Sequence, residues 1–196
     1  MTIHTLIEAL RELLIIIPAV LLTITVHEYF QLFAAIKFGD TTPSDNGYFR
    51  FNPLLFIDII GFLMFVLFRY GWSKNIPYDE RNFKYPKLQS FYVILTGLAA
   101  NLLTAFVFIL LIVLYKPRPD GYIYNLFMAS TQLNLNYFVL SLVPLYPMAA
   151  GRVINIFYPK FYKTEFIGTL LLVLMIVFNF TATFDKIIFD FIKIFI

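Results

Sequence analysis

The sequence contains no cysteine among its 196 residues, and only 14% of those residues are charged. The absence of cysteine excludes disulfide bonds, thiolate catalysis and cysteine-ligated metal sites. Soluble globular domains carry about 25% charged residues, so this low charge content excludes an ordinary soluble domain. The remaining composition, with 60% hydrophobic residues, is typical of an integral membrane protein.

Histidine is equally scarce, because His4 and His27 are the only two in the chain. An imidazole-based metal site is therefore short of ligands from the start. The formal net charge is +3, and the basic residues are dispersed along the chain rather than clustered. This modest, dispersed charge indicates that nucleic acid is not a partner.

Long apolar runs predict an all-α integral membrane protein that forms a single membrane domain over residues 1–196. Segment 54–69 is shorter than the roughly 20 residues that a span needs, so it is either a span or a re-entrant helix. The amphipathic segments 3–12 and 187–196 suit helices that lie in the membrane interface. The predicted bundle has about four to five membrane spans, with clear spans at 13–36, 91–115, 126–149 and 166–184.

The first of these spans contains a polar stretch, His27-Glu28-Tyr29-Phe30-Gln31. Ionisable residues at membrane depth are costly and usually face a protein interior where they have a function. The zinc-protease pattern H-E-x-x-H places two histidines one helical turn apart to hold zinc, and its glutamate acts as general base. His27 and Glu28 match the first half of this pattern, whereas Gln31 stands at the second histidine.

Further motifs follow in order, and together they resemble the site-2 protease family, the intramembrane zinc metalloproteases. They are Gly39-Asp40-Thr41-Thr42-Pro43, Asn52-Pro53-Leu54 with Ile57-Asp58 and Gly61, Gly71-Trp72-Ser73-Lys74-Asn75-Ile76-Pro77, Gly97-Leu98-Ala99-Ala100-Asn101, and Pro144-Leu145-Tyr146-Pro147-Met148-Ala149-Ala150-Gly151-Arg152. The resemblance implies a site-2-protease-like helical bundle. It also implies that the protein resides in the bacterial cytoplasmic membrane.

The departures from the family pattern fall on its zinc ligands. In the family, two histidines and one aspartate hold the zinc, and the glutamate deprotonates a zinc-bound water. The resemblance assigns His27 to the first ligand and Glu28 to the general base, whereas Gln31 and Ala149 occupy the other two ligand positions. The family therefore implies zinc as a cofactor, but these two replacements predict that zinc is not bound and that Glu28 is vestigial.

Three further residues are candidates for substrate binding, namely Asn52, Asp58 and Asn101. The resemblance places Asn101 beside the active site and the substrate. The alternative for Asn101 is an interhelical hydrogen bond at a close packing point. Asp58 has the alternative of capping a helix or pairing with a basic residue at the membrane edge.

Three functions compete on this sequence. The first is a pseudoprotease that binds transmembrane segments, or a related membrane protease, without cleaving them. The second is an active intramembrane zinc metalloprotease with an atypical metal site. The third is a small channel or transporter, which predicts an internal repeat or a charged pathway that the sequence does not show. We rank the pseudoprotease first, because two of the three expected zinc ligands are absent.

Overall fold

The computed structural model describes residues 3–50 and 52–195, and within them it contains helices and no strand. This confirms the predicted all-α class. The helices are α1 Ile3–Lys37, α2 Thr42–Asp45, α3 Ile59–Phe68, α4 Pro86–Tyr115, α5 Tyr122–Ser141, α6 Ala149–Phe157, α7 Glu165–Val177 and α8 Ala182–Lys193, with short 3-10 turns at Pro53–Phe56, Glu80–Asn82 and Phe161–Thr164.

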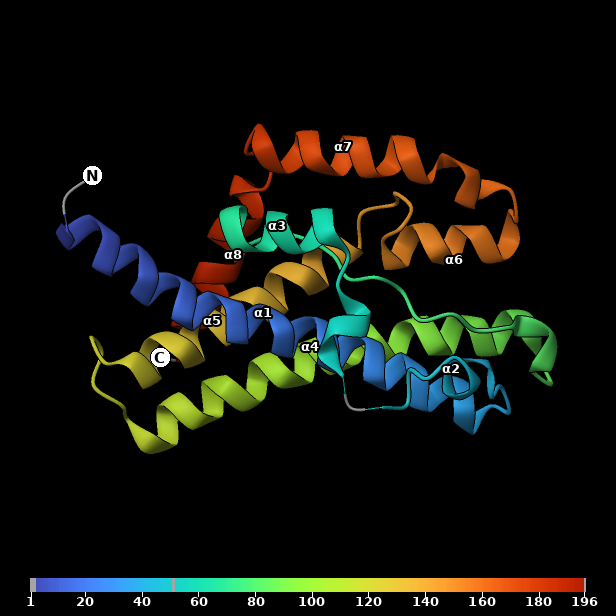
Figure 1. Cartoon of the computed structure of the whole chain (residues 1–196), viewed down its shortest axis with the longest axis horizontal. Coiled ribbons are helices and arrows are strands. Elements are labelled where there is room, and N and C mark those ends of the chain that lie inside the picture. The colour runs from blue at the N-terminus through green and yellow to red at the C-terminus, as the bar shows by residue number, and fades with distance from the viewer. Residues whose placement is uncertain (1–2, 51, 196) are drawn as a thin grey trace.

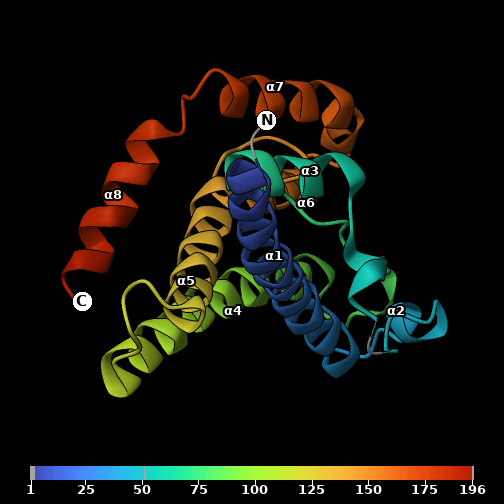
Figure 2. The same ribbon diagram turned by 60° about the vertical axis from the view of Figure 1, so that its left-hand side comes forward.

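Helices α1, α4 and α5 form the centre of the molecule (Figures 1 and 2). Helices α1 and α4 are each long and apolar enough to cross a membrane. The bent pair formed by residues 161–177 and α8 adds a third candidate span if it is counted as one. The chain is therefore a helical membrane protein with two to three candidate spans within the described residues, and the larger number of spans stays a prediction.

Several predicted segments have different bounds in the structure. The interfacial segment 3–12 is not a separate helix, because α1 continues through it. The segment 126–149 is not one helix, because α5 ends at Ser141. Proline restricts its own φ and disfavours a helical residue before it, so Pro144 and Pro147 keep this stretch irregular until α6 begins.

The C-terminal part also departs from the prediction of a straight span at 166–184. Helix α7 ends at Val177, and α8 begins at Ala182 after a bend of 67°. Asn179 in the connection has a φ of 59°, a left-handed conformation that ends a helix. Figure 2 shows the result, with α8 turned away from α7 and down the side of the bundle. The predicted interfacial segment 187–196 begins inside α8, and residue 196 lies outside the described residues.

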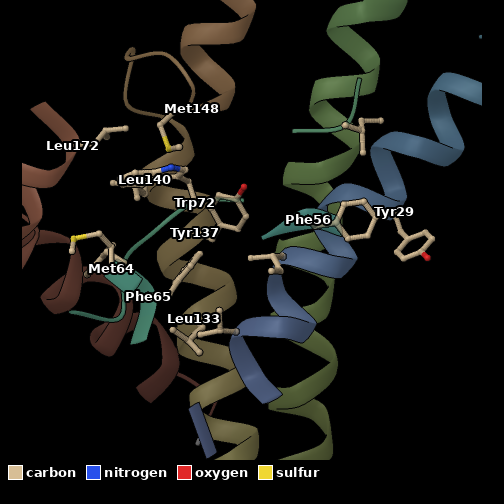
Figure 3. Packing of buried hydrophobic residues seen from close by; sticks show 14 of the residues in the cluster. Tyr29, Phe56, Met64, Phe65, Trp72, Leu133, Tyr137, Leu140, Met148 and Leu172 are labelled. Atoms are coloured by element: carbon tan, nitrogen blue, oxygen red, sulfur yellow. The ribbon is translucent and has the colours of Figure 1, made fainter. Parts of the chain in front are cut away.

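Helix α3 lies within the segment predicted to be either a span or a re-entrant helix. It has 10 residues, a length of about 15 Å against a membrane core of about 30 Å. Helix α3 alone is therefore too short to cross. The extended chain that follows it carries Trp72, which packs with Phe65 of α3 and Tyr137 of α5 in the buried core (Figure 3). This packing fixes the extended segment 70–78 inside the bundle.

Two loops at the far end of α1 are joined through Asp40, which is fully buried. Its carboxylate accepts hydrogen bonds from the N–H and hydroxyl of Thr42, from the N–H of Asp79 and from the side chain of Asn82. Burial raises the pKa of Asp40, but the hydrogen bonds from Thr42, Asn82 and Asp79 outweigh burial and hold that pKa below its ordinary value. Asp40 therefore fixes the loop after α1 against the segment that leads into α4.

We expect Asp40→Ala to lower the free energy of unfolding by about 2 kcal/mol or more, because buried donors to a charged acceptor lose their partner. Thermal unfolding and limited proteolysis of the two loops measure this. The pKa of Asp40 is lower in the folded protein than in the unfolded chain. The ionised carboxylate therefore stabilises the fold at neutral pH, and this stabilisation is lost as the pH falls below about 4. Asp45→Ala, at an exposed carboxylate of the short helix α2 that follows Asp40, is the control and should change little. An equal effect of both variants would contradict this role for Asp40.

Candidate functional site

The polar residues of the first span form one buried face of α1. His27, Glu28 and Gln31 are 2%, 0% and 0% exposed, and Gln31 lies one helical turn from each of the other two, four residues after His27 and three after Glu28. Gly97 of α4 lies directly opposite. A Cβ atom there would lie 2.6 Å from Gln31 Nε2 and 2.9 Å from His27 Nε2, so only glycine allows this approach of α4 to the two side chains.

A chain of hydrogen bonds fixes the imidazole of His27. His27 Nδ1 lies 2.7 Å from Asn101 Oδ1, and Asn101 Nδ2 donates to Asn134 Oδ1 over 3.1 Å. Asn134 Nδ2 donates in turn to the Ser130 carbonyl and to Thr23 Oγ1, whose own hydroxyl donates to the Ala19 carbonyl. The chain thus ends on carbonyl oxygens, which can only accept.

This ending sets the direction of every bond in the chain. Because Asn134 donates to a carbonyl, its oxygen faces Asn101, and the oxygen of Asn101 consequently faces His27. Nδ1 of His27 must then carry a proton, and in a neutral ring Nε2, on the side of Gly97 and Gln31, keeps a lone pair. The site thus orients its histidine as partners orient a metal ligand in other proteins.

Glu28 is held by the extended segment 70–78. Its Oε1 accepts from the hydroxyl of Ser73 over 2.5 Å, and its Oε2 accepts from the Ile76 N–H over 3.0 Å. The hydroxyl of Tyr137 also contacts Ser73 Oγ. The hydroxyl hydrogen of Ser73 is used in its hydrogen bond to Glu28. The hydroxyl of Tyr137 is therefore the donor in its contact with Ser73 Oγ. Both oxygens of the predicted general base are therefore engaged by the protein itself.

Gln31 is held by an arginine from α6. Arg152 is only 7% exposed, and its Nη1 donates to Gln31 Oε1 over 2.8 Å and to Asn75 Oδ1 over 2.7 Å. Ala149, one turn before Arg152, is buried and packs with Ile94 and Leu98 of α4. The first turn of α6 therefore lies against the part of α1 and α4 that carries Gln31 and Gly97.

These side chains do not fit a zinc ion. His27 Nε2 is a suitable donor, but Gln31 Oε1 is occupied by a guanidinium and Ala149 offers no donor atom. The amide Nε2 of Gln31 is buried without a hydrogen-bond partner, and it is a donor of hydrogen rather than of a lone pair. Within residues 3–50 and 52–195, no three histidine, cysteine, aspartate or glutamate side chains gather into a group that could hold a metal.

Asn52 and Asp58 lie apart from this group. Asn52 accepts from the Leu54 N–H and Asp58 from the Gly61 N–H, so each caps the short helix that follows it. Asp58 also lines a cavity of about 270 Å³ that reaches Ser73 and Tyr146. Substrate binding by Asn52, Asp58 and Asn101 stays a prediction.

Sequence reasoning missed four residues of the site, which are Ser73, Tyr137, Asn134 and Arg152. Arg152 and Ser73 stand inside motifs that were recognised, but their contacts with Gln31 and Glu28 arise only when distant segments meet. Asn134 and Tyr137 belong to the polar helix α5. Nothing in the sequence of that helix shows which of its polar side chains meets His27.

The chain is similar to a protein named "Putative zinc metalloprotease YwhC" of Bacillus subtilis (strain 168). The two are 30% identical over 147 residues, which cover 71% of this chain and 67% of the Bacillus protein. No family model matches the chain. No solved structure matches it significantly. On this identity and coverage, the chain belongs to the metalloprotease-like family of which the Bacillus subtilis protein is a member.

Proposed function

We propose that this chain is a site-2-protease-like membrane protein that binds transmembrane segments, or a related membrane protease, without cleaving them. One observation carries the proposal, namely the hydrogen bond from Arg152 to Gln31. The side chain at the second ligand position is paired with a cation, and a zinc ion placed beside a guanidinium would be repelled. A retained scaffold with a blocked metal position suits binding better than hydrolysis.

The two cavities beside the site support binding. One of about 290 Å³ is lined by Arg152, Tyr78 and Asn155, and the other, of about 270 Å³, is lined by Ser73 and Asp58. Tyr146 lines both of them. Both lie along the extended segment 70–78, so a segment of another protein bound there would contact the site without reaching a reactive group.

Photo-crosslinking in proteoliposomes tests binding and cleavage together. A photoreactive residue at position 146 should crosslink to single-span test proteins that remain full-length. The same residue at position 110, a lipid-facing position that is 54% exposed, is the matched control and should crosslink far less. Equal crosslinking from both positions would contradict binding at the site. Appearance of cleaved test protein would contradict the absence of hydrolysis.

An active zinc metalloprotease with an atypical site is the second candidate. It is favoured by the retained pair His27 and Glu28, by the lone pair on His27 Nε2, and by the name of the Bacillus relative. This function requires tightly held zinc, because the ligands must keep the ion bound while water reacts.

We expect the protein purified without added zinc to contain far less than one zinc per chain. A complete structural zinc site contributes about 10 kcal/mol or more of binding free energy in simple peptides, and a single imidazole cannot replace it. Elemental analysis of the detergent-solubilised protein measures the content. One tightly held zinc per chain would favour the active protease.

A further inference from the structure

Arg152 is a buried cation whose hydrogen bonds tie three parts of the fold together. It lies on α6, reaches Gln31 on α1 and Asn75 on the extended segment, and stacks with its guanidinium carbon 5.9 Å from the ring centre of Tyr78. A charge at 7% exposure is strongly unfavourable unless an opposite charge lies near it.

Glu28 is the candidate for that opposite charge. Its Oε1 is hydrogen-bonded to the Ser73 hydroxyl and its Oε2 accepts from the Ile76 N–H, so both oxygens of the carboxyl group are held in place. Burial opposes ionisation of this group, whereas the positive charge of Arg152 favours it. The two groups grip neighbouring residues of that segment, since Ile76 donates to Glu28 and Asn75 accepts from Arg152. Gln31, the second partner of Arg152, lies about one helical turn from Glu28 on the same helix.

We propose that the guanidinium of Arg152 supplies the positive charge of this site. It balances the buried Glu28 carboxylate, as the charge of a metal ion would otherwise do. Arg152 is then a positioning residue. Together with Glu28 it holds segment 70–78 between α1 and α6, at the wall shared by the two cavities. The site keeps its shape with no metal ion.

This inference deepens the proposed function, since a metal-independent site is what a non-cleaving binder requires, but it can fail separately. Failure of single-span proteins to crosslink at position 146 would remove the binding function and leave the charge pair untouched. The charge pair is tested by stability alone, on the full chain in detergent.

A double-mutant cycle of Glu28→Gln and Arg152→Met measures the pairing. Each single substitution leaves one buried charge uncompensated, so we expect each to lower the Tm by about 10 °C or more. The double variant removes both charges, so it should recover at least half of the larger loss. Arg152→Lys keeps the charge with fewer hydrogen bonds, and its Tm should lie above that of Arg152→Met.

Glu80→Gln is the matched control, because Glu80 lines the same cavity as Arg152 but is exposed. Its effect should add to that of Arg152→Met without any recovery. The wild-type Tm should not change with added zinc or with a chelator. Additive losses in Glu28→Gln/Arg152→Met, a double variant that does not fold, or a wild-type Tm that falls with chelator would each overturn the proposal.

Discussion

Gln31→His together with Ala149→Asp is expected to bring zinc binding to near one ion per chain. Position 31 lies one turn from His27 on the same face of α1, and the first turn of α6 reaches that face through Arg152. The two substitutions would complete the two-histidine, one-carboxylate ligand set, while the Asn101 chain already presents Nε2 of His27. Elemental analysis and zinc titration of the purified variant measure the result.

Each single substitution should bind much less zinc than the pair, because affinity depends on completing the ligand set. Adding Arg152→Met to the pair should tighten zinc binding further, since it removes a cation beside the ion. Peptidase activity need not follow, because Ser73 still engages Glu28. A folded triple variant, with Arg152→Met added to the pair, that still binds no zinc would show that residue 149 does not face His27 and Gln31, and the site-2-protease-like arrangement would then be wrong.

The face that carries His27, Glu28 and Gln31 could be predicted from sequence because it depends on one helix. The period of an α-helix fixes which residues share a side, and the cost of polar groups in a membrane requires that side to be buried. Asn101 could be placed near this face through its motif alone. The hydrogen bond between Asn101 and His27, and which of the two donates in it, could not be predicted. They depend on Asn134 and Thr23 from two other segments.

The contacts that close the site depend on tertiary structure and were not predictable. From sequence alone, Arg152 is a basic residue in a loop or at the start of a helix. It becomes a partner of Gln31 only because α6 approaches α1 in the fold. From sequence alone, Ser73 is an ordinary residue of a polar loop. In the fold, the packing of Trp72 and Tyr137 places its hydroxyl beside Glu28. Helix ends at Ser141 and Val177 were also missed, because apolar composition continues past both of them.

Gly61 and Gly71 allow the extended segment to approach α3 closely. We therefore expect a large loss of stability when either glycine is replaced. A Cβ atom on Gly61 would lie 2.2 Å from the backbone oxygen of Trp72, and one on Gly71 would lie 2.1 Å from the backbone oxygen of Gly61. Neither contact can be relieved by turning a side chain. The segment that carries Ser73 to Glu28 must therefore move if either glycine gains a side chain.

We expect Gly61→Ala to lower the free energy of unfolding by about 2 to 3 kcal/mol, even though alanine in a helix normally gains about 1 kcal/mol over glycine.

Gly97→Ala should cost less, because the nearest atom it meets is the end of the flexible Gln31 side chain, although that shift would disturb the bond from Arg152. Ile59→Ala, at a position of α3 that is 83% exposed, is the control and should change stability by about 0.5 kcal/mol or less. Denaturant or thermal unfolding in detergent ranks the three variants. A Gly61→Ala variant as stable as the wild type would mean that α3 and the extended segment are not in backbone contact, and the hydrogen bond from Ser73 to Glu28 would lose its structural support.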